Sequence, residues 1–161
     1  MLYVADNGNI AGTIRIVKSG EQKPMLPILE YCFRYNGGYV CLERLFDDGR
    51  LEKIREAESQ VGGLALGERY RANNSGLFIL FKLFYECLRI AKEEEIKNAL
   101  ICSRPRQTSL YEKVGAEILL RDACFRFSSR KGEYDKPADV LHISTDNLME
   151  RLSVLKNRFF S

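Results

Sequence analysis

Apolar and polar positions along this 161-residue chain alternate with two different periods. The clearest helical pattern covers residues 77–95. Its polar positions recur every three or four residues and form one narrow stripe, at Lys82, Glu86, Arg89 and Glu93. Because almost every other position as far as Ala91 is apolar, we expect a mostly buried helix.

Shorter patterns predict strands on both sides of this helix. An Asn-Gly pair, which favours tight hairpin turns, separates strands expected at residues 2–5 and 10–17. Short apolar or alternating runs predict the remaining strands, at residues 64–66, 99–102, 117–128 and 139–144. The strand at 99–102 is apolar throughout, which is typical of a strand buried on both faces.

Three further helices are expected, at residues 51–59, 107–114 and, as a last amphipathic helix, about 146–159. Gly115 ends the second of these, and Thr145 or Asp146 caps the third. Residues 129–137 are expected to form a polar loop. Between residues 18 and 60 the pattern is weak, with a short helix expected at 29–34 and a strand at 39–42. The order of elements predicts an α/β (α+β) fold in which residues 64–102 form a right-handed parallel unit.

Composition narrows the class of protein. Apolar residues make up 45% of the chain, which is ordinary for one globular domain over residues 1–161. The 25 basic and 22 acidic residues give a net charge of only +3, which does not favour nucleic-acid binding. Five cysteines without a C-x-x-C pair predict reduced, buried thiols and a cytoplasmic protein, with no metal site. No targeting pattern or membrane span is expected.

The stretch from Gly67 to Gly76 carries the candidate chemistry. A polar loop with Arg71, Asn73, Asn74 and Ser75 joins the strand at 64–66 to the start of the long helix. The free N–H groups of a first helical turn attract anions, and an arginine adds a fixed planar charge. We therefore expect a phosphate or pyrophosphate site here, the alternative being an ordinary capped loop. Arg104 follows the next strand, so that it and Arg71 are expected to face the same crevice.

Two stretches resemble motifs of the GNAT acyltransferases, the Gcn5-related N-acetyltransferase superfamily. Residues 71–76, Arg-Ala-Asn-Asn-Ser-Gly, are similar to the Q/R-x-x-G-x-G/A loop of this superfamily. Residues 109–116, Ser-Leu-Tyr-Glu-Lys-Val-Gly-Ala, resemble its A-x-x-L-Y-E-K-x-G-F segment. The resemblance implies a GNAT-like fold, with a mostly antiparallel twisted sheet, a splayed parallel pair and helices on both faces, shortened at the N-terminus.

The resemblance also implies roles for particular residues. Backbone N–H groups from Asn73 to Gly76 hold the pyrophosphate of acyl-CoA, and Leu64, Ala65 and Leu66 pair with its pantetheine arm. Tyr111 is the general acid that reprotonates the leaving thiolate, because a phenol with a pKa near 10 matches a thiolate in basicity. The alternative is that Tyr111 is a helix residue packed on the sheet.

Within the superfamily, the hairpin over residues 10–17 and the Pro-containing insertion after it resemble the autoinducer synthases and N-acyl amino acid synthases. Their donors are acyl-CoA or acyl-carrier protein, and an acidic carrier is expected to meet the arginines at 69, 71, 104 and 106. Candidate bases for the incoming amine are Glu43, Glu58 or a water near Gln60. Arg15 and Arg44 are candidate substrate contacts, whereas His142 and Cys102 are interpreted as structural.

The chain departs from the family pattern in four respects. Asn74 replaces the middle glycine of the loop, Ala116 replaces a phenylalanine, and Arg104 stands where asparagine is common. The family's first strand is missing, so either Met1 is not the biological start or this is a shortened member whose last helix compensates. That helix is expected either to cap the domain or to join two copies as a homodimer.

Two functions follow from these patterns. The first is an N-acyltransferase that moves an acyl group from a pantetheine thioester to a small-molecule amine by direct attack. The second is a non-catalytic module that binds an acyl thioester or CoA, which the imperfect loop favours. A nucleic-acid-binding domain is the weakest alternative, because the charge balance does not support it.

Overall fold

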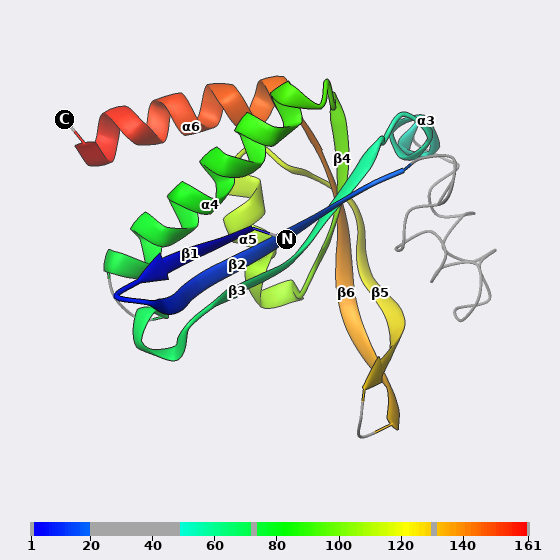
Figure 1. Cartoon of the computed structure of the whole chain (residues 1–161). Helices are drawn as coiled ribbons and strands as arrows, with labels where there is room; N and C mark the ends of the chain where they lie inside the picture. The colour runs from blue at the N-terminus through cyan, green and yellow to red at the C-terminus, as the bar shows by residue number, and fades with distance from the viewer. Residues whose placement is uncertain (1, 20–48, 72–73, 130–131, 161) are drawn as a thin grey trace.

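The computed structural model describes residues 2–19, 49–71, 74–129 and 132–160. A six-stranded sheet with the order β1-β2-β3-β4-β6-β5 forms its centre (Figure 1). Its strands are β1 (Leu2–Asp6), β2 (Asn9–Lys18), β3 (Ser59–Leu66), β4 (Asn98–Ser103), β5 (Glu117–Ser129) and β6 (Gly132–Ser144). The helices are α3 (Arg50–Arg55), α4 (Asn74–Glu93), α5 (Pro105–Lys113) and α6 (Thr145–Phe160), and a short 3₁₀ turn η1 (Glu68–Tyr70) precedes α4.

The sheet is antiparallel except at one place. β3 and β4 are parallel, and they pair over three positions only, Ser59 with Ala99, Gln60 with Leu100 and Val61 with Ile101. All other neighbouring strands run antiparallel. The mixed, mostly antiparallel sheet with one short parallel pair confirms the fold class expected from the sequence.

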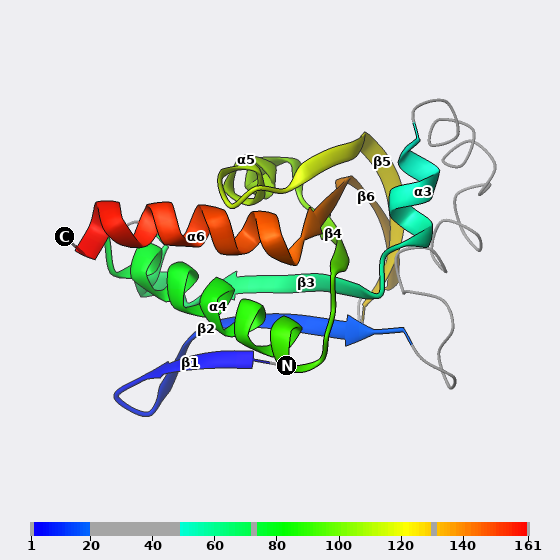
Figure 2. The ribbon, with the colours of Figure 1, turned by 90° about the horizontal axis from the view of Figure 1, so that it is seen from above.

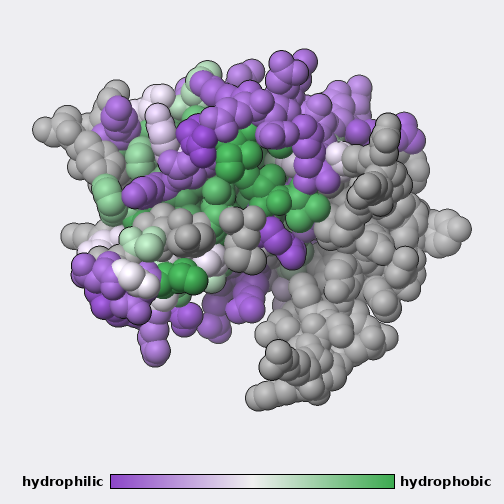
Figure 3. All heavy atoms as spheres, in the orientation of Figure 1, coloured by the Kyte–Doolittle hydropathy of each residue, from purple (hydrophilic) through white to green (hydrophobic). Residues whose placement is uncertain are grey.

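Helices α4, α5 and α6 pack on one face of the sheet. Ile101 and Ala99 of β4 share a buried cluster with Leu83 of α4, Tyr111 of α5 and Leu148 of α6. Successive side chains of a strand point to opposite faces, so the fully buried Leu100 lies on the other face of the sheet. Figure 2, seen from above, shows α4 and α6 side by side. Figure 3 shows apolar residues in the middle of one face, below hydrophilic residues over the helices.

The described part of the chain differs from the sequence prediction in three elements. β3 is longer than residues 64–66, α3 ends at Arg55, and the polar loop expected at 129–137 is wrong because β6 begins at Gly132. The reason is that β5 and β6 continue as a hairpin beyond the end of β4 (Figure 1). Backbone pairing with one neighbour does not require an apolar face, and Pro137 is tolerated because β4 ends at Ser103, opposite Asp139.

The elements expected at residues 29–34 and 39–42 lie outside the described residues. The helices expected at 77–95 and 107–114 are confirmed as α4 and α5, which begin at Asn74 and Pro105 and end at Glu93 and Lys113, slightly earlier than expected at both ends. No helix within the described ranges has the length and apolar character needed to cross a membrane.

Candidate active site

The central feature is the point at which β3 and β4 separate. Their last paired residues are Val61 and Ile101, after which β3 pairs with β2 alone and β4 with β6 alone. Figure 1 shows the two strands crossing near this point, after which β3 runs on beside β2 and β4 leads into α5. Among the described residues, the edge of β3 that faces away from β2 therefore has no strand partner beyond Val61.

Backbone groups of β3 point into the opening between β3 and β4 that begins beyond Val61 and Ile101. The Gly67 N–H donates to the Ala11 carbonyl of β2 at 2.8 Å, so the N–H and C=O of Leu66, one residue earlier, point to the opposite edge. By the same alternation, the backbone groups of Leu64 point there as well. The Leu66 carbonyl accepts a hydrogen bond from Nε of Arg71 at 3.0 Å. Arg71 thus links the end of β3 to the loop that leads into α4.

A β-bulge lies beside the opening. Thr13 pairs with Ala65 and Arg15 with Gly62, so two residues of β3 stand opposite Ile14 alone. Gly63 adopts a φ of +64°, which an L-residue rarely takes, and the Thr13 hydroxyl donates to its carbonyl at 3.4 Å. A bulge bends its strand and increases the local twist, which turns the following residues away from β4.

The first turn of α4 lies directly beyond the end of β3. The η1 turn reverses the chain through hydrogen bonds from the Tyr70 N–H to the Gly67 carbonyl at 2.9 Å and from the Arg71 N–H to the Glu68 carbonyl at 3.2 Å. No acidic residue stands in the first turn of α4, so no carboxylate of this turn opposes the helix dipole there. A β-carbon placed on Gly76 would lie 1.9 Å from the Tyr70 carbonyl oxygen, so only glycine fits this close approach.

Tyr111 lies on α5 and is 2% exposed. Its ring packs edge-on against Phe84, with 5.8 Å between the ring centroids. Burial raises the pKa of the phenol, and the nearby Cys87 and Cys102 thiols raise it further. Cys102 immediately follows Ile101, the last residue of β4 paired with β3. The phenol is therefore buried, protonated at neutral pH, and close to the residue at which the strands separate.

The two cysteines beside Tyr111 are not nucleophiles. Burial raises the pKa of the Cys87 thiol to about 12 and that of the Cys102 thiol to about 11, with smaller contributions from Glu86 and Asp139 respectively. A reactive cysteine needs the opposite shift, since the thiolate is the attacking form. The interpretation of Cys102 as a core residue agrees with this environment.

A buried polar cluster that the sequence analysis missed holds α5 in place. The Thr108 hydroxyl donates to one carboxylate oxygen of Asp139 at 2.6 Å, and the Asp122 N–H donates to the other at 2.9 Å. Thr108 and Asp139 are each 2% exposed. Thr108 is three residues before Tyr111, so this cluster ties the helix of the phenol to β5 and β6. The sequence signal that could have revealed this cluster was Asp139, an aspartate at the start of the apolar run 139–144.

His142 lies on β6, away from the opening. It pairs with Leu100 of β4 and Glu117 of β5, and its Nε2 is the one buried side-chain polar atom without a hydrogen-bond partner among the described residues. Lys53 of α3 forms an ion pair with Glu117 beside it. Burial lowers the pKa of the imidazole, and Lys53 lowers it further against the opposing effects of Glu117 and Glu56.

This environment predicts that stability falls in mild acid. The folded-state pKa of His142 is lowered, so the unfolded chain binds a proton first as the pH drops below about 6.5. We expect the free energy of unfolding to fall by no more than about 1.4 kcal/mol per pH unit there, before the carboxylates titrate. Urea unfolding from pH 7.5 to 5.5 measures this. Since His142 is the only histidine of the chain, a His142→Gln variant with the same slope would contradict the assignment.

Comparison with known proteins supports the fold. No family model matches the sequence, and no curated protein matches it. Among solved structures, FeeM, an N-acyl amino acid synthase from uncultured soil microbes, matches over 92% of this chain and 74% of its own, with a TM-score of 0.60 and 19% identity. The chain has the GNAT fold. An agmatine N-acetyltransferase mutant and a polyamine N-acetyltransferase of Drosophila melanogaster match at 12% and 10% identity, over 88% of this chain and 72% and 71% of theirs, each with a TM-score of 0.47.

Within this GNAT fold, the structure brings several expected residues to one place. Leu64, Ala65 and Leu66 line the free edge of β3, and Ser75 and Gly76 lie in the first turn of α4. Arg71 and Arg104 are exposed and follow the ends of the parallel strands β3 and β4. Asn73 lies outside the described residues, as does the side chain of Asn74.

Glu58 is not at the opening. Its carboxylate accepts the Lys97 N–H at 2.6 Å, at the amino-terminal start of β3. Val61, beyond which the opening begins, is three residues further along, which corresponds to about 10 Å of extended strand. Through its hydrogen bond with the Lys97 N–H, Glu58 therefore stabilises the turn between α4 and β4. Glu43 and Arg44, the other candidates from the same part of the chain, lie outside the described residues.

Proposed function

We propose that this protein is an N-acyltransferase that moves an acyl group from a pantetheine thioester to a primary amine. The observation that carries the proposal is the juxtaposition of three features of its GNAT fold. Among the described residues, β3 has no strand partner on one edge beyond Val61, the first turn of α4 carries no acidic residue, and α5 holds the buried phenol of Tyr111. Each feature has a separate task in acyl transfer.

The donor is acyl-CoA or an acyl-carrier protein, held as a co-substrate. Its pantetheine amides pair with the backbone groups of Leu64 and with the Leu66 N–H, as an added strand would. The N–H groups of the first turn of α4, up to Gly76, bind the pyrophosphate of CoA or the phosphate of a carrier's prosthetic arm. Exposed Arg71 and Arg104 add positive charge at the mouth of the opening.

The reaction is direct attack of the amine on the thioester carbonyl. The C–N bond forms, negative charge develops on the carbonyl oxygen, and a backbone N–H on the free edge of β3 stabilises it. The C–S bond then breaks, and the thiolate takes a proton from the Tyr111 hydroxyl. Burial raises the pKa of Tyr111, so the phenol is neutral before the thiolate forms, although the same shift makes it a weaker acid than an ordinary phenol.

The acceptor is a small amine, and we propose an amino acid. Arg15 is exposed on β2 and pairs with Gly62, next to the bulge, so its guanidinium is available for a carboxylate of the acceptor. Glu58 is unsuited as the base that deprotonates the amine, because its carboxylate is occupied far from the opening. A water beside Gln60 takes this role. The buried thiol of Cys87 and the partly buried thiol of Cys102, both protonated, fit a reducing cytoplasm.

Thermal melting with ligands tests the donor site. At about one hundred times its Kd, a ligand that binds only the folded state adds about 2.7 kcal/mol, a rise in Tm of roughly 6–10 °C. We expect this with CoA, acetyl-CoA or long-chain acyl-CoA, and the dependence on chain length reports the acyl preference. Arg71→Ala should remove most of the shift, because the loop loses its link to the Leu66 carbonyl as well as a charge.

Arg121→Ala is the matched control, since Arg121 is exposed on β5 and its one ion-pair partner among the described residues is Glu112, at 3.9 Å. Its ligand-induced shift should equal that of the unsubstituted protein. If CoA compounds produce no shift but an acyl-carrier protein does, the donor is the carrier. If neither binds, the enzyme proposal is wrong. Binding without any acyl transfer to a panel of amines would instead favour the non-catalytic module.

A further inference from the structure

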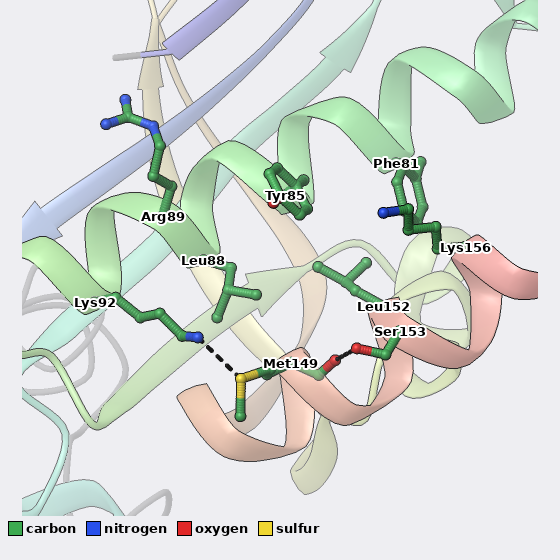
Figure 4. Close-up of a pocket in the computed structure, with 9 residues that line it drawn as sticks. All are labelled: Phe81, Tyr85, Leu88, Arg89, Lys92, Met149, Leu152, Ser153 and Lys156. Atoms are coloured by element: carbon green, nitrogen blue, oxygen red, sulfur yellow. Dashed lines mark hydrogen bonds between the residues drawn. The ribbon is translucent and has the colours of Figure 1, made fainter.

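A second cavity lies on the other side of α4 from the sheet, in the groove between α4 and α6 (Figure 4). Its volume is about 340 Å³. Nine side chains line it: Phe81, Tyr85, Leu88, Arg89, Lys92, Met149, Leu152, Ser153 and Lys156. None of them belongs to the candidate active site. Phe81, the residue of the groove nearest the start of α4, is seven residues after Asn74, which separates the groove from the start of that helix by about 10 Å.

The floor and one wall of the groove are apolar. Leu88 and Leu152 form the floor and are 6% and 3% exposed. Phe81 and Tyr85 stack along α4 with 6.5 Å between their ring centroids, and Tyr85 remains 51% exposed. A wall of this kind accepts an apolar ligand at little cost, since the exposed aromatic surface leaves water on binding.

The charged side chains that line the groove are all basic. Its lining includes three cations and no carboxylate. Glu86 and Glu93 neutralise Arg89, at 2.9 and 2.6 Å. Lys92 has no ion-pair partner among the described residues, and its Nζ contacts the Met149 sulfur at 3.0 Å. Lys156 likewise has no ion-pair partner in the described part of the chain. Two unneutralised ammonium groups therefore flank an apolar floor.

We propose that this groove binds an anionic amphiphile, a single apolar chain with a carboxylate or phosphate head group. If each methylene occupies roughly the 30 Å³ of a water molecule, 340 Å³ holds about eleven of them. The chain lies on Leu88 and Leu152, and the head group pairs with Lys92 or Lys156. Small-molecule sites have this composition, with apolar walls and a few polar groups that fix the orientation.

Titration of the full-length protein with sodium decanoate tests this site by amide NMR. We expect saturable shifts confined to residues 78–93 of α4 and 148–157 of α6, with a Kd below the concentration at which decanoate forms micelles. Decanol and decyltrimethylammonium, which have the same chain without the negative charge, should bind at least tenfold more weakly. Equal binding of decanol, absence of saturation, or shifts centred elsewhere would each overturn the proposal.

Charge-reversal variants separate the groove from general electrostatics. Lys92→Glu and Lys156→Glu together should raise the Kd for decanoate tenfold or more. Lys82→Glu is the matched control, because Lys82 is an exposed lysine of the same helix that does not line the groove, and its Kd should stay unchanged. If anionic vesicles bind through these residues while monomeric decanoate does not, the face is a membrane surface and the proposed ligand site is wrong. No donor or acceptor is needed, so the outcome is independent of acyl transfer.

Discussion

Replacing Tyr111 with phenylalanine is expected to lower kcat by a hundredfold or more while the Kd for the donor changes less than threefold. General acid–base catalysis by one side chain contributes about 10²- to 10⁴-fold, and phenylalanine removes the proton without changing the ring. The contact with Phe84 remains, so the fold should persist. Steady-state kinetics with free-thiol detection and calorimetric donor binding measure the two quantities separately.

A donor analogue distinguishes proton donation from packing. An acidic leaving thiol needs no proton in the transition state, so the Tyr111→Phe variant should recover most of its rate on a thioester whose thiol is several pKa units more acidic than pantetheine. A purely structural role would slow both donors equally. If the variant turned over the natural donor at the original rate, Tyr111 would be one more packed residue of α5 and a different acid would have to be sought.

Replacing Gly76 with alanine is expected to damage both stability and the donor site. The added carbon would lie 1.9 Å from the Tyr70 carbonyl oxygen, so either α4 or the η1 turn must move. Such overpacking costs about 3 kcal/mol, or roughly 6–10 °C in Tm for a chain of this size. Because the N–H groups of the first turn move with the helix, the Kd for the donor should rise at least tenfold.

Gly62→Ala is the matched control for stability. No atom of the described residues lies within 4 Å of a β-carbon at Gly62, and the φ of Gly62 is not in the left-handed region, so the Tm of this variant should change by less than about 2 °C. Differential scanning fluorimetry compares the two variants, and calorimetry with the donor compares the Gly76 variant with the unsubstituted protein. Unchanged donor affinity in Gly76→Ala would place the phosphate site away from the start of α4.

The sequence by itself determined the parts of this protein that depend on local patterns. The single polar stripe of residues 77–95 predicted a mostly buried helix, and α4 has buried residues along most of its length. The continuous apolar run at 99–102 predicted a strand buried on both faces, which β4 is. These predictions succeed because the spacing of apolar residues along a short segment reflects both the period of the element and the positions that are buried. The spaced pair of motifs at 71–76 and 109–116 likewise indicated the GNAT fold.

The tertiary structure alone decided where the site is and which residues can reach it. No local sequence pattern identifies Val61 and Ile101 as the last pair of β3 and β4. The bulge at Gly63 likewise arises from the register of β3 with β2. Glu58 was a reasonable base by type, yet its bond to the Lys97 N–H holds it at the far end of β3. The Thr108–Asp139 cluster and the groove between α4 and α6 join residues 31 and more than 50 positions apart. Contacts over such separations depend on how the elements pack, which no local pattern in the chain encodes.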